Sequence, residues 1–288
     1  MQSELFGDSN LNAESGRQQT DCRIENFPKL PFCVEVAAEF AEFTGKKDQR
    51  TSYPVPTSGA VRGFLESFFW KPAVKYIPRA VEVLKPIRRM DIKKNELKQG
   101  FKGDFSPVSI EEDRIQRNNS YLRDVLYRIH CDLVFIPSEL RKEFYKGYQS
   151  RNEQDENPMK YYEMLKRRIR KGQYCKSPYL GTRECVCSSV EWIDDAEAEK
   201  TNPIDQTGDL GMMYVDYIYN EDYNPEQRAR MLKIVSMENG GKSNVDKGFS
   251  PRPVSARIGI ENGVVRYPSK YDLLDEMLQK MEKFWMEK

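Results

Sequence analysis

The segment from Ser52 to Pro72, SYPVPTSGAVRGFLESFFWKP, constrains the fold more than any other part of the chain. Pro54 and Pro56 restrict φ and hold the residues before them in extended conformations, so no helix can begin before this point. Thr57 or Ser58, which follow Pro56, can cap the first free N–H groups of a helix. Apolar residues then recur at helical spacing. The segment therefore predicts an extended chain followed by a short helix over 58–70 whose glycines allow another backbone to come close.

Hydrophobic alternation and turn residues predict further strands and helices along the chain. A polar stretch at 91–119 is predicted to be a long loop, and 138–158 a charged connection that holds a short helix over 139–148. A basic helix is predicted to end at Gly172. The order is β-α-β-β-α-β, which is that of a ferredoxin-like sheet, with strands over 32–44, 74–90, 121–136 and 182–192 and helices over 58–70 and 160–171.

The pattern changes after residue 200. Short strand-like pieces separated by turns between 205 and 267 predict a small antiparallel sheet. A terminal amphipathic helix over 271–288 has an apolar stripe that covers the protein's own core or, as the alternative, docks on a neighbouring subunit. We therefore expect an α+β protein with three parts: a flexible extension over 1–30, a ferredoxin-like domain over 31–200 with an inserted loop, and a C-terminal β subdomain with the terminal helix over 201–288.

The net charge is only +1, but the charge is unevenly distributed. Lys75–Lys102 holds nine Lys/Arg against three Asp/Glu, and Met159–Lys176 holds seven against one, so each segment carries +6. Acidic residues are concentrated in 191–199 and 220–226. A segregated positive field attracts a polyanion to one side of a protein. We expect the two basic segments to converge on one groove wide enough for a nucleic-acid strand, although solvated helix faces would give the same composition.

Several classes of protein are not supported by the sequence. No apolar run approaches the roughly 18 to 20 residues of a membrane span, and the N-terminal residues do not resemble a secretory signal, so we expect a cytoplasmic protein with no membrane partner. The single histidine and the six cysteines, none in a CxxC pair, predict no metal site. No glycine-rich phosphate loop is present. The sequence predicts no cofactor.

The motif SYPVPT…A.RG…ES.FWKP resembles the signature of the CRISPR-associated Cas-five family of subtype I-C (Dvulg), in the RAMP superfamily. Pieces such as VLKPIRRMDIKKNE (83–96), MKYYEMLKRRIRKGQ (159–173) and YLGTREC (179–185) accompany it in the family's order. The resemblance covers roughly residues 31–265. It implies the same ferredoxin-like fold, and a subunit that cleaves pre-crRNA in the repeat and then remains on the crRNA 5′ handle.

The resemblance also implies partners. These are the backbone and large subunits of a type I-C interference (Cascade) complex, and target DNA only indirectly. A non-catalytic scaffold that grips the handle while another protein cuts is the alternative within the family. A generic RNA-binding module with RRM-like architecture is a third class, but no RNP-type aromatic motif is visible on the predicted strands.

The cleavage that the family performs needs no metal, because the substrate's own 2′-hydroxyl attacks its phosphate. The protein must position the phosphate, move a proton and stabilise the spreading negative charge. The resemblance implies an aromatic residue or histidine in the ES-x-x-WKP motif and a Lys-His pair at the start of the second helix; here these positions are Phe69 and Lys160-Tyr161. Phe69 cannot carry a proton, so we expect Lys160 to stabilise charge while Tyr161 or Tyr162 moves the proton.

Basic and aromatic side chains supply the candidate RNA contacts. Tyr53, Phe69 and Trp70 can stack on bases, as in the recognition of single-stranded RNA, although Trp70 in this context is more often a core residue. The basic side chains would meet phosphates or remain solvated. The candidates are Arg62, Arg88, Arg89, Lys93, Lys94, Arg117, Lys166, Arg167, Arg168, Arg170 and Lys171.

Overall fold

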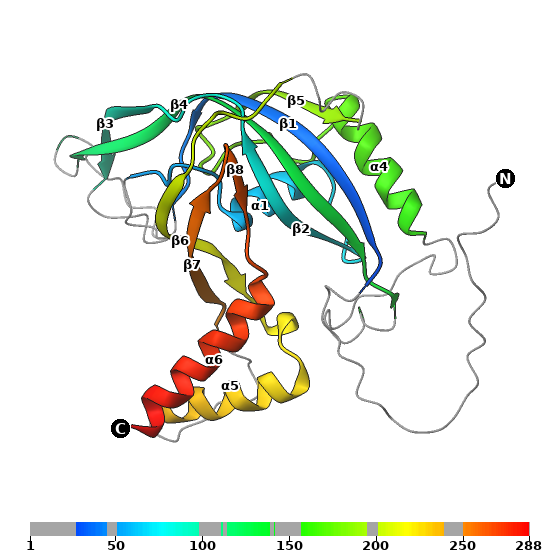
Figure 1. Cartoon of the computed structure of the whole chain (residues 1–288), viewed down its shortest axis with the longest axis vertical. Helices are drawn as coiled ribbons and strands as arrows, with labels where there is room; N and C mark the ends of the chain where they lie inside the picture. Colours follow the sequence, from blue (N-terminus) through cyan, green and yellow to red (C-terminus); the bar gives the residue numbers. More distant parts are fainter. Residues whose placement is uncertain are drawn as a thin grey trace.

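The computed structural model describes residues 27–44, 51–97, 111, 114–138, 141, 157–194, 201–238 and 250–287. Within these residues the chain is a mixed α/β protein with antiparallel sheets and four α-helices (Figure 1). The strands are β1 (Lys29–Ala41), β2 (Val74–Val83), β3 (Arg89–Leu97), β4 (Arg114–Phe135), β5 (Cys187–Ile193), β6 (Gly208–Ile218), β7 (Arg252–Ile260) and β8 (Val264–Arg266). The helices are α1 (Ser58–Phe68), α4 (Pro158–Arg170), α5 (Pro225–Glu238) and α6 (Lys270–Met286), with a short 3₁₀ turn η4 at Asn220–Asp222.

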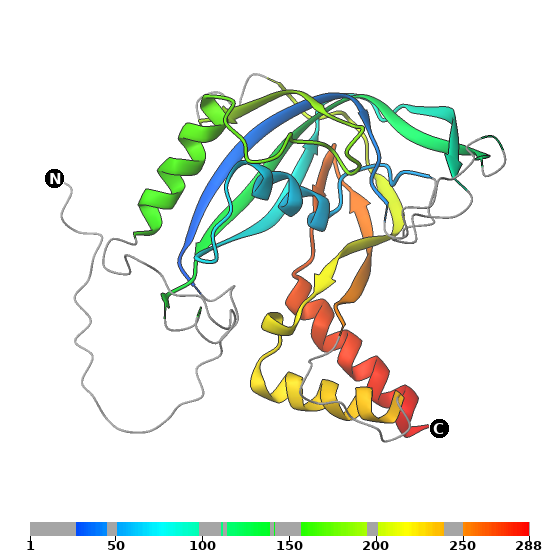
Figure 2. The same ribbon diagram turned by 180° about the vertical axis from the view of Figure 1, so that it is seen from behind.

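The large sheet has the order β5-β1-β4-β2-β8, with every neighbouring pair antiparallel. Alternate residues of β1, including Phe32, Val34 and Val36, are buried on one face of this sheet. The helix α1 lies against this face, as Figure 2 shows, and contributes Leu65 and Phe68 to the core. The helix α4 adds Leu165 and Ile169 to the same core.

The predicted loop at 91–119 is wrong where the chain is described. The strand β3 pairs with the first half of β4 in a register that runs from Arg89 opposite Leu122 to Leu97 opposite Arg114. The residues of β3 and the first five residues of β4 are exposed or half-buried on both faces, and buried side chains of β4 begin only at Asn119, so this part of the sequence shows no hydrophobic alternation. A two-stranded arm that covers no core cannot be told from a loop by its pattern. Of the predicted flexible extension over 1–30, residues 1–26 fall outside the described residues, whereas Lys29 and Leu30 already belong to β1 and pair with β4. The predicted helix over 139–148 falls outside the described residues except at 141.

Local capping explains where two helices begin and end. The helix α4 starts at Pro158 because the Asn157 side chain accepts a hydrogen bond from the Met159 N–H, and proline at the first position donates none. The helix α1 ends at Phe68, two residues before the predicted end, because Phe69 is extended. Both helices otherwise match the predictions.

The C-terminal part confirms some expectations and corrects others. The strands β6 and β7 form the predicted small antiparallel sheet, but β8 joins the large sheet beside β2. The helix α5 was not predicted. Its signal is a reciprocal cap, since Asn224 and Gln227 each accept a backbone N–H hydrogen bond from the other.

The terminal helix α6 packs against the protein's own core, as its apolar stripe predicted. Leu274 and Leu278 are fully buried, and Met277, Met281 and Trp285 are half-buried against the core. The guanidinium of Arg230 on α5 donates two hydrogen bonds of 2.7 Å to Glu282 on α6. None of the described helices combines the length and apolar character needed to cross a bilayer.

The contact between α1 and β6 depends on one ion pair and one glycine. Arg62 donates hydrogen bonds of 3.0 and 2.9 Å to the two carboxylate oxygens of Asp216, and one of 3.0 Å to Glu66. Although burial disfavours the ionised carboxylate, the hydrogen bonds and charge of Arg62 hold the pKa of Asp216 below its usual value. A Cβ at Gly59 would lie 2.9 Å from Asp216 Oδ1, so only glycine fits at this crossing.

We predict opposite effects of alanine at the two glycines of α1. Gly59→Ala should destabilise the protein by about 1–3 kcal/mol, because Asp216 is held by Arg62 and cannot move away freely. Gly63→Ala is the matched control, since no heavy atom lies within 4 Å of its added Cβ. It should stabilise by about 0.5–1 kcal/mol through helix propensity. Urea unfolding measures both changes, and equal effects at the two positions would contradict this account of the α1–β6 contact.

Candidate nucleic-acid interface

An aromatic cluster joins the end of α1 to the start of α4. The ring centroid of Tyr161 lies 5.8 Å from that of Phe69 and 5.9 Å from that of Phe135 on β4, and the Tyr161 and Phe135 rings are stacked at 23°. Phe69 is 1% exposed and Tyr161 8% exposed. Phe69 is therefore a packing residue that supports Tyr161, and its ring is not available to stack on a base.

Hydrogen bonds hold the backbone around Phe69. The Tyr76 hydroxyl on β2 donates a 2.7 Å hydrogen bond to the Phe69 carbonyl. The guanidinium of Arg168 on α4 donates a 2.7 Å hydrogen bond to the Phe68 carbonyl and lies 5.2 Å from the centre of the Phe69 ring. Arg168, predicted to contact RNA, is thus used to fasten α4 to the end of α1.

The other two predicted catalytic residues lie on either side of Tyr161 in the sequence. Lys160 is exposed in the first turn of α4. Tyr162 points to a different neighbourhood: its ring packs edge-on against Trp192 at 5.3 Å, and its hydroxyl donates to the Pro31 carbonyl at 3.3 Å. The structure therefore brings Tyr161 to Phe69, leaves the adjacent Lys160 exposed, and holds Tyr162 against β1 and β5.

Several predicted RNA-binding cations are engaged in ion pairs. Lys166 and Arg170 both bind Asp194, whose pKa is lowered by the hydrogen bond from Lys166 and the charge of Arg170. Lys94 binds Glu184, and its ammonium lies 4.7 Å from the centre of the Tyr121 ring. The remaining pairs are Arg62 with Asp216 and Glu66, and Arg117 with Glu96 at 3.5 Å.

Other candidates are placed differently. Arg89 donates to the Ser52 carbonyl at 2.8 Å. Tyr53 is half-buried against the core, and its hydroxyl accepts a hydrogen bond from the Tyr214 N–H, so the structure uses it as a packing residue. Within the described part of the chain, four candidates are exposed and their side chains form no hydrogen bond or ion pair: Arg88, Lys93, Arg167 and Lys171.

The prediction of one groove between the two basic segments is wrong. Figures 1 and 2 both place β3 and α4 at opposite ends of the large sheet. The sequence could not show this, because the separation results from β3 pairing with the outer half of β4. The β2 part of the first segment does lie near α1, where Tyr76 contacts the Phe69 carbonyl. The β3 part of the first segment and the helix α4 therefore form separate basic surfaces, and only the β2 part lies near α1.

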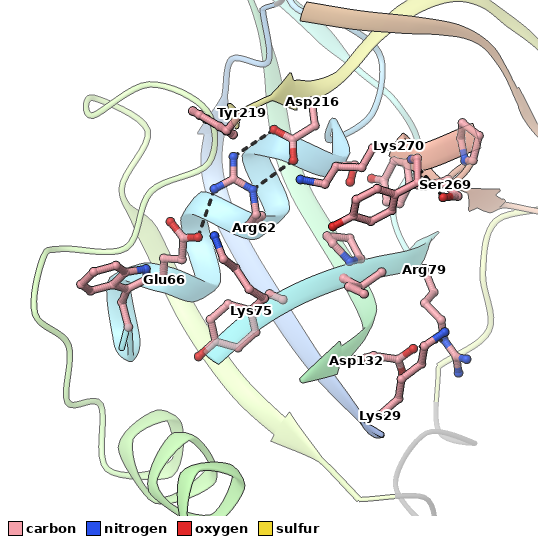
Figure 3. A pocket seen from close by; sticks show the side chains of 18 residues that line it. Lys29, Arg62, Glu66, Lys75, Arg79, Asp132, Asp216, Tyr219, Ser269 and Lys270 are labelled. Carbon is pink, nitrogen blue, oxygen red and sulfur yellow. Dashed lines mark hydrogen bonds and ion pairs between the residues drawn. The ribbon is translucent and has the colours of Figure 1, made fainter. Parts of the chain in front are cut away.

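A pocket of about 390 Å³ lies at the edge of β2 that β8 leaves uncovered, between α1 and the start of α6 (Figure 3). The ring of Trp70, which is 48% exposed, lines it, so Trp70 is not a core residue. Sequence reasoning missed this pocket, because its walls come from distant parts of the chain. Its charged residues are Lys29, Arg62, Lys75, Arg79 and Lys270 against Glu66, Asp132 and Asp216.

Comparison with known proteins identifies the family. The family model "CRISPR-associated protein (Cas_Cas5)" matches residues 32–245, which is more than half of the chain. A Mannheimia succiniciproducens protein named CRISPR pre-crRNA endoribonuclease Cas5d is 33% identical over 219 residues, covering 69% of this chain and 90% of that protein. The Thermus thermophilus protein of the same name is 39% identical over 153 residues, covering 52% of this chain and 59% of that protein. The chain belongs to the CRISPR-associated Cas5 family.

Solved structures agree with this assignment. A structure titled "Crystal Structure of CRISPR-associated Protein" matches with a TM-score of 0.55 at 25% identity, covering 85% of this chain and 95% of that one. A functionally uncharacterized protein from Streptococcus mutans has the same TM-score at 22% identity, covering 85% of this chain and 96% of that one, which supports the fold alone.

We predict that neutralising Asp194 strengthens binding of single-stranded RNA. Asp194→Asn would release Lys166 and Arg170 from their ion pairs. Each released cation that reaches a phosphate should steepen the slope of log affinity against log salt by about 0.7. Fluorescence anisotropy across a salt series measures the slope. Asp209→Asn, which releases Arg257 in the C-terminal part, is the control and should leave the slope unchanged. If Asp194→Asn also leaves the slope unchanged, this face of α4 is excluded from the interface.

Proposed function

We propose that this Cas5-family protein is a metal-independent pre-crRNA endoribonuclease of a type I-C system, which keeps the crRNA 5′ handle after cleavage. The observation that carries the proposal is the 33% identity to a protein named pre-crRNA endoribonuclease along 90% of that protein's length. The position of Lys160 supports it, because this exposed lysine lies at the N-terminal end of a helix, where the backbone also favours an anion. The backbone and large subunits of an interference complex, and through them target DNA, are its proposed partners.

We also infer that β1, α1, β2, β4, α4 and β5 form a ferredoxin-like unit. The support is the spatial strand order β5-β1-β4-β2, with the two helices on one face of an antiparallel sheet. The arm of β3 and outer β4 is then an extension of that unit. The small sheet of β6 and β7 and the helices α5 and α6 form the proposed C-terminal subdomain.

The proposed reaction needs three actions from the protein. The substrate 2′-oxygen attacks the adjacent phosphorus as its proton is removed, and the bond from phosphorus to the 5′-oxygen breaks. The products are a 2′,3′-cyclic phosphate and a 5′-hydroxyl, which takes up a proton. Lys160 and the N-terminal N–H groups of α4 stabilise the negative charge on the phosphate oxygens. The Tyr161 hydroxyl moves a proton, and its ring is oriented by Phe69 and Phe135.

A non-catalytic scaffold is the second candidate, and one observation favours it. Phe69 carries no ionisable group, and it is packed with Tyr161 rather than open to solvent. A protein that only binds the handle would need the exposed cations but no side chain that transfers a proton. The two candidates differ in whether the purified protein changes the covalent structure of a repeat RNA.

Lysine substitutions on α4 separate the candidates. With repeat RNA in EDTA, the parent protein should form a shorter product, and Lys160→Ala should reduce the single-turnover rate on the order of 10²-fold through loss of charge stabilisation. Lys171→Ala, at the other end of α4, should weaken binding without changing the rate at saturating protein. Intact RNA with the parent protein, together with normal binding, would establish the scaffold instead.

Substitutions of Tyr161 test the proton transfer. Tyr161→Phe keeps the ring packing but removes the hydroxyl, and should lower the cleavage rate by about 10²-fold or more. Tyr161→His should raise the rate at pH 7 and add an ionisation at about pH 6.5 to the pH–rate profile, because histidine titrates close to neutrality. A Tyr161→Phe variant with the parent rate would assign the proton to another group.

A further inference from the structure

The side chain of Asp132 is buried beside one cation but accepts no hydrogen bond from the described residues. It lies on β4 opposite Pro31 of β1 and Ile77 of β2, on the sheet face that α1 and α4 do not cover, and is 1% exposed. Neither carboxylate oxygen accepts a hydrogen bond from any described residue. Its ion-pair neighbour, Arg79 Nε, is 3.4 Å from Oδ2. Buried carboxylates normally accept several hydrogen bonds, so this one has unused acceptor capacity.

Burial of Asp132 has a measurable consequence. Desolvation raises its pKa above the usual value, although the charges of Arg79 and Lys29 act in the opposite direction. Because the pKa is higher in the folded protein than in the unfolded chain, folding is favoured as pH falls towards the unfolded pKa and is disfavoured at neutral pH. Asp132 therefore lowers the stability of the fold at neutral pH unless a further partner donates hydrogen bonds to it.

Asp132 lines the pocket at the free edge of β2. Figure 3 shows Asp132 with Lys29 and Arg79 at one end of this pocket, and Arg62, Lys75 and Lys270 at the other. Five cations against three carboxylates give the pocket a net positive charge. Its volume of about 390 Å³ falls within the range of small-molecule sites.

The pocket adjoins the proposed cleavage cluster. Trp70, which lines the pocket, is the residue after Phe69, and Tyr76, another lining residue, donates its hydroxyl hydrogen bond to the Phe69 carbonyl. The exposed indole of Trp70 offers a stacking face for a base. A single RNA strand bound at the start of α4 can thus continue into this pocket.

We propose that the pocket binds a guanosine nucleotide of the RNA, with the two oxygens of Asp132 accepting the N1–H and N2–H groups of the guanine. Guanine is the base that presents two adjacent donors on its Watson–Crick edge, which match the two unused acceptors of one carboxylate. Adenine and cytosine present one amino group beside an acceptor there, and uracil presents one N–H between two carbonyls. The positive charge around the pocket favours the phosphates of the same strand. This inference rests on the proposed function, because it takes RNA as the ligand.

Inosine tests the contact in the unaltered protein, because it lacks only the 2-amino group of guanosine. The probes are uridine pentanucleotides whose central residue is guanosine, inosine or uridine, measured by fluorescence anisotropy at fixed salt. The guanosine probe should bind on the order of tenfold more tightly than the inosine probe. Equal affinity for the guanosine and inosine probes would overturn the proposal.

Asp132→Asn should remove the preference for guanosine over inosine while leaving the affinity for the all-uridine probe unchanged. Asp124→Asn is the matched control, since Asp124 is exposed and forms an ion pair with Lys85, and it should keep the full preference. A preference retained in Asp132→Asn would overturn the assignment of Asp132. If that variant does not fold, the inosine comparison in the parent protein decides the outcome alone.

Two further measurements separate the possible ligands and functions. Free guanosine 5′-monophosphate should compete with the guanosine probe more weakly than the unlabelled pentanucleotide does, because it makes the contacts of only one nucleotide. Stronger competition by the free nucleotide would mean that the ligand of the pocket is a free nucleotide and not RNA, and would overturn the proposal. Cleavage of repeat RNA is scored separately. Loss of cleavage with an intact guanosine preference would contradict the proposed enzyme and leave this pocket standing.

Discussion

The site depends on the contact of the Tyr161 ring with Phe69 and Phe135, which joins the first turn of α4 to the end of α1 and to β4. Aromatic pairs of this kind contribute about 0.5–1.5 kcal/mol each beyond the burial of their surface. This contact holds the start of α4, and with it Lys160, in one position. Tyr76 and Arg168 support the contact through the carbonyls of Phe69 and Phe68. Trp70, which lines the pocket, directly follows Phe69, so the pocket begins one residue from this contact.

Ion pairs decide which cations remain available for RNA. Asp194 neutralises one side of α4, and Glu184 neutralises Lys94 on β3. Exposed pairs of this kind stabilise the fold by only about 0–1 kcal/mol. Their larger effect is on the field that a polyanion meets. Charge counting along the sequence overestimates that field, since it cannot detect partners that lie far apart in the chain.

The sequence predicted most of the elements that have a covered face, with α5 as the exception, and it missed the arm of β3, which has none. The helix α1 was predicted because prolines and apolar spacing restrict it locally, and the stripe on α6 indicated its packing against the core correctly. The arm of β3 was predicted as a loop because neither of its faces is buried. The helix α5 carried a capping signal at Asn224 that was overlooked. The carboxylate of Asp132 gave no signal, because it becomes buried only when β4 pairs with β1 and β2.

Crosslinking tests most directly the central claim that RNA lies where α1 meets α4. A repeat RNA carrying 4-thiouridine at successive positions, irradiated with the purified protein, should give adducts on peptides that contain Trp70 or the first turn of α4. Mass spectrometry of the digested adducts identifies these peptides. Adducts confined to α5 and α6, with none at Trp70 or Lys160, would contradict the account.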